Sequence, residues 1–274
     1  MELRLWNLLS HEEMELRAVP RRDWRYLSAG GRHVFLIDSE GVPALFHVRE
    51  DGEGVEPMEV FSLPGGLTCG AVSSLGDGGY AICDAFGNVF TVPDDRAEGS
   101  RVRAGVQMLS YSDSLVILDR NGNVRVRSRA GAWRDADVSG VYKISAGRSE
   151  HAFLERNGRV HITDPGGIVS PAMERKSRAL GRVTDIAETS AGVAVLREGR
   201  LYLDGRMVIT GSGDLVSLSC GISDTLECIV CRRGDGSFLS ILTGPTFSPS
   251  SLGMEAPSQI KVYEAGDRFL ACLI

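Results

Sequence analysis

The chain repeats one pattern along its length: an apolar strand, a break rich in glycine and serine, a second apolar strand, an acidic turn ending in glycine, and a third strand. The clearest copy is residues 141–162, VYKISAGRSEHAFLERNGRVHI, and a second is residues 24–46, WRYLSAGGRHVFLIDSEGVPALF. Self-similarity at a period of a few tens of residues is typical of architectures in which each repeat is one supersecondary unit. The repeat therefore constrains the fold more than any single residue does.

The turns give the phase of the repeat. Each lies between two apolar runs, and its closing glycine supplies the positive φ that a tight hairpin needs. The strands before the turns are nearly continuous apolar runs, which predicts strands buried on both faces. We expect hairpins at residues 38–41, 84–87, 119–122, 155–158, 197–199 and 234–236.

The two ends of the chain complete each other. Each full unit has room for four strands, whereas residues 259–274 read as a first and second strand and residues 1–19 as a third and fourth. A β-propeller hides its sheet edges by building its last blade from both termini. We therefore predict an all-β, seven-bladed β-propeller, with its last blade closed by strands from both termini and a single domain over residues 1–274.

Two units also carry a resemblance to a known family. The matching residues are Gly147, His151, Leu154, Asn157, Gly158 and Val160 in one unit, and Gly30, His33, Leu36 and Gly41 in the other. On these residues the chain resembles the regulator of chromosome condensation repeat family, as a divergent member. The resemblance implies a β-propeller and permits guanine-nucleotide exchange on a small GTPase. The Gly-His and Trp-Asp dipeptides of WD repeats are absent.

Composition excludes several classes of protein. A net charge of −6 argues against general nucleic-acid binding, which needs a surplus of Lys and Arg. The six cysteines lack a disulfide or zinc pattern, and the single C-x-x-C pair, Cys228 and Cys231, lies in an apolar run that reads as a strand. We find no secretory signal and no segment near the roughly 20 apolar residues that cross a bilayer, so we predict a cytoplasmic or nuclear protein without membrane insertion.

Candidate catalytic residues are few. His33 and His151 occupy the same place in two repeats, which favours a structural role in hydrogen bonding the backbone at the break of each blade. There is no phosphate-binding loop, nucleophile elbow or dinucleotide fingerprint. We therefore predict no catalytic residues, no metal site, no cofactor and no enzymatic activity. An enzyme built in the propeller channel is the alternative that convergent carboxylates there would support.

One charge asymmetry stands out. In a propeller, the hairpins between second and third strands share a face with the loops that link blades. The partner-binding residues that we predict on this face are Arg120, Arg156, Arg197, Arg232 and Arg233. Arginine suits bidentate capture of carboxylate or phosphate, so the expected partner is a protein with an acidic segment.

Four insertions are longer than a connection needs and are further candidates for function or disorder. They are residues 49–57, 93–100, 164–182 and 244–258, and the third is basic. Together these features predict a non-enzymatic protein–protein interaction scaffold that is a subunit of a larger complex and binds through propeller loops. The main alternative is a guanine-nucleotide exchange factor for a small GTPase.

Overall fold

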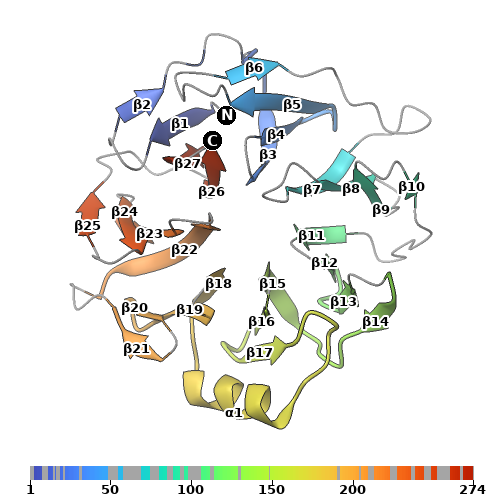
Figure 1. Ribbon diagram of the computed structural model, residues 1–274, viewed down its shortest axis with the longest axis vertical. Coiled ribbons are helices and arrows are strands. Elements are labelled where there is room, and N and C mark those ends of the chain that lie inside the picture. The colour runs from blue at the N-terminus through green and yellow to red at the C-terminus, as the bar shows by residue number, and fades with distance from the viewer. Residues whose placement is uncertain are drawn as a thin grey trace.

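The computed structural model describes most of the chain. The described residues are 3–7, 12–14, 16, 19–20, 22–30, 33–48, 55–57, 69–74, 80–84, 89–92, 96–97, 106–111, 114–128, 131–147, 149–189, 192–203, 205–208, 213–222, 227–235, 238–243, 248–251, 260–265 and 268–273. Within these residues the chain forms seven antiparallel sheets arranged around one axis (Figure 1). The predicted all-β propeller is confirmed.

Each sheet is one blade, and its strands run in sequence order from the axis outward. Blade 1 contains β3(Trp24–Gly30), β4(His33–Asp38), β5(Pro43–Val48) and β6(Val55–Pro57). Blade 2 contains β7(Cys69–Ser74), β8(Tyr80–Asp84), β9(Val89–Val92) and β10(Arg96–Ala97). Blade 3 contains β11(Val106–Tyr111), β12(Leu115–Asp119), β13(Val124–Arg127) and β14(Trp133–Asp135).

Blades 4 to 6 follow the same order with one exception. Blade 4 has three strands, β15(Val141–Ala146), β16(His151–Glu155) and β17(Val160–Thr163), followed by the helix α1(Pro171–Leu180). Blade 5 contains β18(Asp185–Thr189), β19(Gly192–Arg197), β20(Arg200–Leu203) and β21(Arg206–Met207). Blade 6 contains β22(Leu215–Ile222), β23(Glu227–Arg233), β24(Phe238–Thr243) and β25(Ser248–Ser251).

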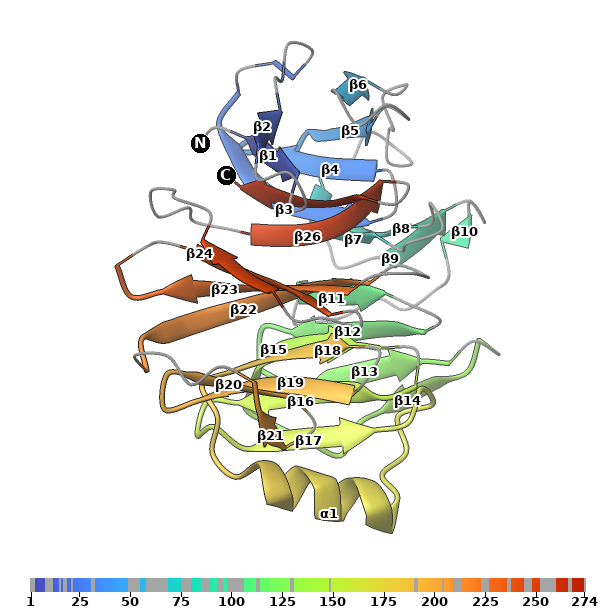
Figure 2. The ribbon, with the colours of Figure 1, turned by 60° about the vertical axis from the view of Figure 1, so that its left-hand side comes forward.

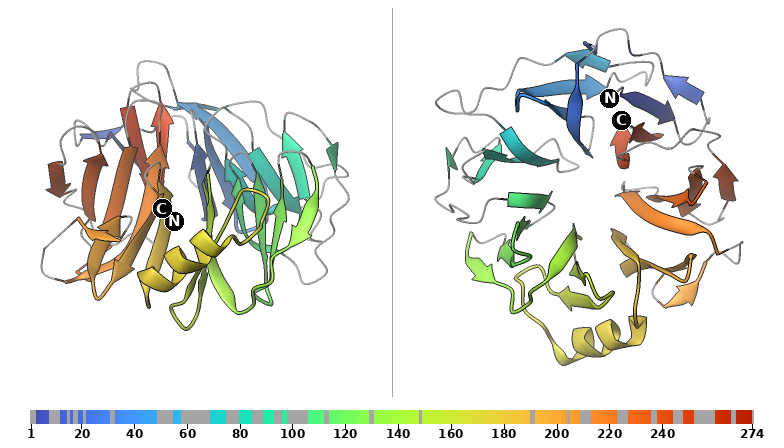
Figure 3. Two further views of the ribbon diagram at one scale, coloured as in Figure 1. Left: turned by 60° about the horizontal axis from the view of Figure 1, so that its bottom comes forward. Right: turned by 180° about the vertical axis from the view of Figure 1, so that it is seen from behind.

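Blade 7 combines strands from both ends of the chain, in the order β26(Ile260–Ala265), β27(Arg268–Leu273), β1(Arg4–Asn7) and β2(Glu12–Met14). β1 pairs antiparallel with β27, from Arg4 opposite Leu273 to Asn7 opposite Leu270. The first strands contact one another around the whole circle, and β26 contacts β3 to close it. The ring is also visible from the opposite side (Figure 3). Closure removes the open sheet edge that a linear array would leave.

The same turn recurs in blades 1, 3 and 4, where an acidic residue ends the second strand. In blades 1, 3 and 4 the amide of the closing glycine donates to the acidic residue, as Gly122 N does to Asp119 O at 3.1 Å. Gly41, Gly122 and Gly158 have φ of 81°, 83° and 87°, the left-handed region that favours glycine. In blade 5 the hairpin is shorter, and both Glu198 (φ 53°) and Gly199 (φ 69°) are left-handed, as a type I′ turn requires.

The core lies between neighbouring blades. Second strands are buried along most of their length, as in Leu115–Leu118 and Val193–Leu196. One cluster joins blades 3 and 4 through Val116, Leu118 and Phe153, while another joins blades 4 and 5 through Leu154, Val193 and Val195. Burial on both faces explains why these second strands lack the alternation of an exposed sheet.

The basic insertion at residues 164–182 is the main departure from the expected loops. It folds into α1, which takes the place of a fourth strand and lies outside β17 (Figure 2). Ser170 caps the helix by accepting from Met173 N at 3.2 Å, Pro171 opens it, and Gly181 ends it at φ 70°. Ser, Pro and Gly at these places are the ordinary start and stop signals of a helix. No helix in the described part of the chain is long and apolar enough to cross a membrane.

Candidate functional site

The face that carries the second-to-third-strand hairpins is held together by backbone hydrogen bonds between turns and linkers. Val141 N donates to Gly122 O at 3.1 Å, Val183 N to Gly158 O at 2.9 Å and Leu215 N to Gly199 O at 3.1 Å. Each hairpin is thereby bonded to the linker that starts the next blade. Side chains at the turn tips therefore stand on a rigid scaffold, which is where binding residues commonly lie.

Two of the five predicted arginines are well presented on this face. Arg120 and Arg156 are exposed at equivalent positions of the hairpins of blades 3 and 4, directly after Asp119 and Glu155. Neither has an ion-pair partner among the described residues. Arg156 N also donates to Gly140 O at 3.1 Å, which ties its hairpin to the linker from blade 3.

The other three arginines are more engaged. Arg197 is half-buried, with its guanidinium 4.4 Å from the ring centre of Tyr202. Arg232 and Arg233 lie in the last two positions of β23 rather than in the turn itself, and both are half-buried. Arg233 Nε lies 3.8 Å from Asp214 Oδ2. The structure thus places Arg120 and Arg156 on adjacent turn tips and holds the remaining three against their own blades.

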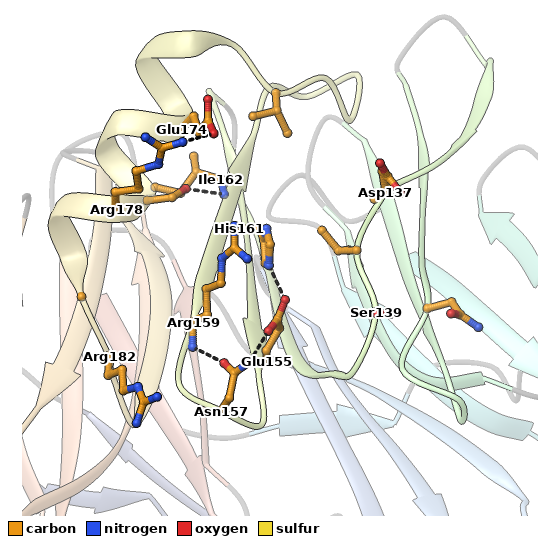
Figure 4. Close-up of a pocket in the computed structure, with 16 residues that line it drawn as sticks. Asp137, Ser139, Glu155, Asn157, Arg159, His161, Ile162, Glu174, Arg178 and Arg182 are labelled. Atoms are coloured by element: carbon orange, nitrogen blue, oxygen red, sulfur yellow. Dashed lines mark hydrogen bonds and ion pairs between the residues drawn. The ribbon is translucent and has the colours of Figure 1, made fainter.

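A cavity of about 950 Å³ opens beside these turns, between blades 3 and 4; we call it the blade 3–4 pocket. One wall is Asn123 of the blade 3 hairpin with the linker from Ala136 to Ser139, and the other is β17 with its hairpin. Glu174, Ser177 and Arg178 of α1 lie above, and Arg182 lies near the hairpin (Figure 4). The sequence analysis missed this pocket, because its walls come from three segments that are distant in the chain.

The hydrogen bonds of the pocket are centred on Glu155. Its carboxylate bonds to His161 Nε2 at 2.5 Å and to Asn157 Nδ2 at 2.5 Å, and Asn157 Oδ1 accepts from Arg159 N at 2.8 Å. Partial burial raises the pKa of Glu155, but the bonds from His161 and Asn157 and the nearby charge of Arg159 outweigh this and leave it below its ordinary value. The Glu155 carboxylate is therefore ionised and already has its partners.

Ion pairs lie on the other side of blade 4, at the joint with blade 5. Lys143 Nζ is 2.5 Å from Asp185 Oδ1 and 3.2 Å from Leu218 O, while Leu218 N donates to Asp185 Oδ2 at 2.8 Å. These three residues come from the first strands of blades 4, 5 and 6. Because Asp185 is buried, this network fixes three adjacent blades in one arrangement.

A second cluster at the same joint contains two carboxyl groups. Glu150 is paired with Lys176 of α1, and Glu188 is buried at the end of β18, where its backbone amide donates to Ser145 Oγ. Burial, reinforced by the nearby Glu150, raises the pKa of Glu188 to about 9. Both carboxyl groups are packed between blades, so they are not the convergent, accessible pair that the enzyme alternative needs.

His151 has the structural role that the sequence predicts, beside backbone groups of Glu150 and Pro165, and it also joins two blades, which the sequence did not predict. It is fully buried, and its Nε2 lies 2.6 Å from the hydroxyl of Ser114 in blade 3. Burial lowers its pKa, partly offset by the neighbouring carbonyls of Pro165 and Glu150, so the ring is neutral at pH 7. Its partner lies 37 residues away, and only the packing of blades brings the two together.

The C-x-x-C pair lies in β23, as expected for strand residues. Cys231 is a buried free thiol whose pKa is raised to about 12 by burial, which makes it unreactive. Across the described residues, no group of three or more His, Cys, Asp or Glu side chains is placed to hold a metal ion.

Comparisons with known proteins identify the fold. No family model and no curated protein sequence matches the chain. Among solved structures, it resembles human WBSCR16 (TM-score 0.68, 11% identity, 96% of this chain and 89% of that one). It also resembles Prp20p from Saccharomyces cerevisiae (TM-score 0.60, 12% identity, covering 99% of this chain and 91% of that one). The Prp20p structure is described together with the binding of Prp20p to Gsp1p and histones.

Prp20 is also described as yeast RCC1. The predicted resemblance to the regulator of chromosome condensation family is therefore confirmed as a likeness of fold. Virginiamycin B lyase from Staphylococcus aureus is similar too (TM-score 0.52, 9% identity, 100% and 99%). Because one fold hosts both binding proteins and an enzyme, function must be argued from the site.

Proposed function

We propose that this protein is a non-enzymatic interaction scaffold that binds a protein partner through the hairpin face of blades 3 to 6. Its partner-binding residues are Arg120, Arg156, Arg197, Arg232 and Arg233, with Arg120 and Arg156 as the leading contacts because they are exposed and have no acidic partner among the described residues. We place the protein in the cytoplasm or nucleus, as a subunit of a larger complex.

The observation that carries the proposal is an uneven distribution of charge. Residues 119–206, which we call the basic sector, contain 16 Lys and Arg against 11 Asp and Glu, whereas the rest of the chain contains 14 against 25. The sector runs from the hairpin of blade 3 to the last strand of blade 5 and includes the two exposed turn-tip arginines. An acidic partner is therefore attracted to one side of an otherwise acidic ring.

The test is affinity purification of the tagged protein from its own cells, as wild type and as the Arg120→Ala/Arg156→Ala variant. The control variant is Arg4→Ala/Arg25→Ala, which removes two exposed arginines in blades 7 and 1, outside the basic sector. We expect one stoichiometric partner that the first variant loses and the control retains. Equal recovery from all three forms would contradict the proposed face.

Guanine-nucleotide exchange on a small GTPase is the competing function. Nucleotide release from a panel of purified GTPases distinguishes it, because a scaffold leaves the release rate unchanged. A rate that rises with the amount of added protein would replace the scaffold proposal with the exchange-factor one.

A further inference from the structure

We propose that the blade 3–4 pocket binds an extended acidic segment of a protein partner, with Arg159 and Arg182 as its anchors. The inference rests on the proposed scaffold function and assigns it a site and a class of ligand. It uses residues other than the five turn arginines, so the two ideas can fail independently.

The pocket exists because α1 packs to one side of blade 4. Leu180, Val183 and Met173 cluster with Val193 and Val195 of blade 5, which fills the outer joint between blades 4 and 5. At the outer joint with blade 3, the segment before α1 reaches Val126 of blade 3 at Gly167, but α1 itself does not fill the joint. There the β17 side chains that face blade 3, among them His161, lie across an open cavity of about 950 Å³ from the Ala136–Ser139 linker.

The charges in the pocket leave two arginines available. Glu155 is occupied by His161 and Asn157, and Glu174 pairs with Arg178 at 2.5 Å. Arg159 and Arg182 are exposed and have no ion pair among the described residues. Asp137 on the opposite wall is the one acid without an ion-pair partner in the described lining. The charges in the pocket that have no ion-pair partner among the described residues therefore sum to a positive value. The guanidinium groups of Arg159 and Arg182 favour carboxylates as ligands.

Apolar surface next to the arginines selects a peptide over a simple anion. Val169 lines the pocket and Ile168 precedes it, and these side chains are 51% and 46% exposed. Val138, which is partly exposed, also contributes to the lining. A segment with one aliphatic side chain on Val169 and acidic side chains on Arg159 and Arg182 matches both surfaces.

A peptide is also favoured over nucleic acid. Asp137 lines the same cavity without an ion-pair partner among the described residues, and the carboxylates of Glu155 and Glu174 lie beside it in their pairs, so a continuous phosphate backbone would not meet an unbroken positive surface. A peptide places its few acidic side chains at chosen points and leaves the remainder neutral. The three wall carboxylates thus set spacing requirements that a peptide satisfies and a nucleic-acid strand does not.

The test is selection from a phage-displayed library of random ten-residue peptides on the full chain. Selected peptides are then titrated by fluorescence anisotropy against wild type, Arg159→Ala/Arg182→Ala and Arg175→Ala. Arg175 is a matched control because it is exposed on α1 and does not line the pocket. We expect aliphatic-acidic peptides whose affinity falls at least tenfold in the double variant and is unchanged in Arg175→Ala.

Three results would overturn the proposal: no enrichment of acidic peptides, equal affinity for all three proteins, or stronger binding of a mixed-sequence RNA that displaces the peptides. The same variants in the affinity purification separate the two ideas. If the cellular partner is lost with Arg120→Ala/Arg156→Ala but kept with Arg159→Ala/Arg182→Ala, the scaffold proposal stands and the pocket proposal fails. If selected peptides bind the pocket but no cellular partner is recovered, the pocket stands and the scaffold proposal fails.

Discussion

Blade 4 has two joints with very different chemistry. Its joint with blade 5 is closed along its depth, by the Lys143–Asp185–Leu218 network near the axis and by the apolar side of α1 outside. Its joint with blade 3 is closed near the axis by Phe153, Val116 and the Ser114–His151 bond, but it opens outward into the pocket. One helix that replaces a strand thus closes one joint and leaves the other hollow.

The two joints also respond to pH in opposite directions. At the blade 5 joint, the unfolded chain releases the Glu188 proton near pH 4.5, whereas the folded protein keeps it up to about pH 9. Between these two values the free energy of unfolding therefore falls as the pH rises. At the blade 3 joint, burial lowers the pKa of His151 in the folded protein, whereas the unfolded chain takes up this proton below about pH 6.5. The free energy of unfolding therefore falls as the pH falls. Similar repeats can thus form joints of which one loses stability at high pH and the other at low pH.

The largest effect is expected from breaking the charged joint. Lys143→Met removes the counter-charge of buried Asp185 while keeping most of the side-chain volume. We expect a loss of roughly 3–5 kcal/mol in unfolding free energy, because the remaining carboxylate is buried without a cation. Urea denaturation measures the loss. A change below 1 kcal/mol would show that the network does not hold the blades together.

Glu188→Gln tests the same joint in the opposite direction. Wild type must protonate Glu188 in order to fold at pH 7, whereas glutamine is neutral at every pH. We therefore expect the variant to be more stable than wild type at pH 7, by up to about 3 kcal/mol. The gain should grow from pH 6 to pH 8.5. Thermal unfolding across this pH range measures it, and a gain that is independent of pH would contradict the assigned protonation state.

Gly158→Ala tests how tightly the hairpin of blade 4 is bonded to the next linker. A Cβ at Gly158 would lie 2.9 Å from Val183 O, at a φ of 87°. The matched control is Gly131→Ala, with a φ of 83° but only the flexible end of Arg127 nearby, at 3.9 Å. We expect losses of about 2–3 and about 1 kcal/mol in denaturant unfolding. Equal losses would mean that the linker moves freely.

The smallest effect is expected at the neutral joint. Ser114→Ala removes the hydroxyl that lies 2.6 Å from His151 Nε2, and we expect a loss of about 1–2 kcal/mol. Because His151 stays buried, the decline in stability below pH 6.5 should persist. Chemical denaturation at pH 5.5 and 7.5 measures both, and a variant without acid sensitivity would assign that sensitivity to Ser114 rather than to burial.

Local chemistry in the sequence was enough to predict the repeat itself. The closing glycines at 41, 122 and 158 announce turns because few other residues adopt a positive φ readily. The apolar runs before them predict buried strands, and the incomplete units at the two ends predict the shared blade. The helix was also visible in principle, in the order Ser170, Pro171 and Gly181.

What no local pattern contained was the relation between blades. His151 meets Ser114, Lys143 meets Asp185, and Arg159 and Arg182 face one pocket only because the ring brings distant segments together. The protonation of Glu188 likewise depends on burial at a joint. Hydrogen-bonded turns and strand patterning act over a few residues, and the sequence by itself determines them. Burial and charge pairing act between residues tens of positions apart, so only the tertiary structure decided where the candidate site lies.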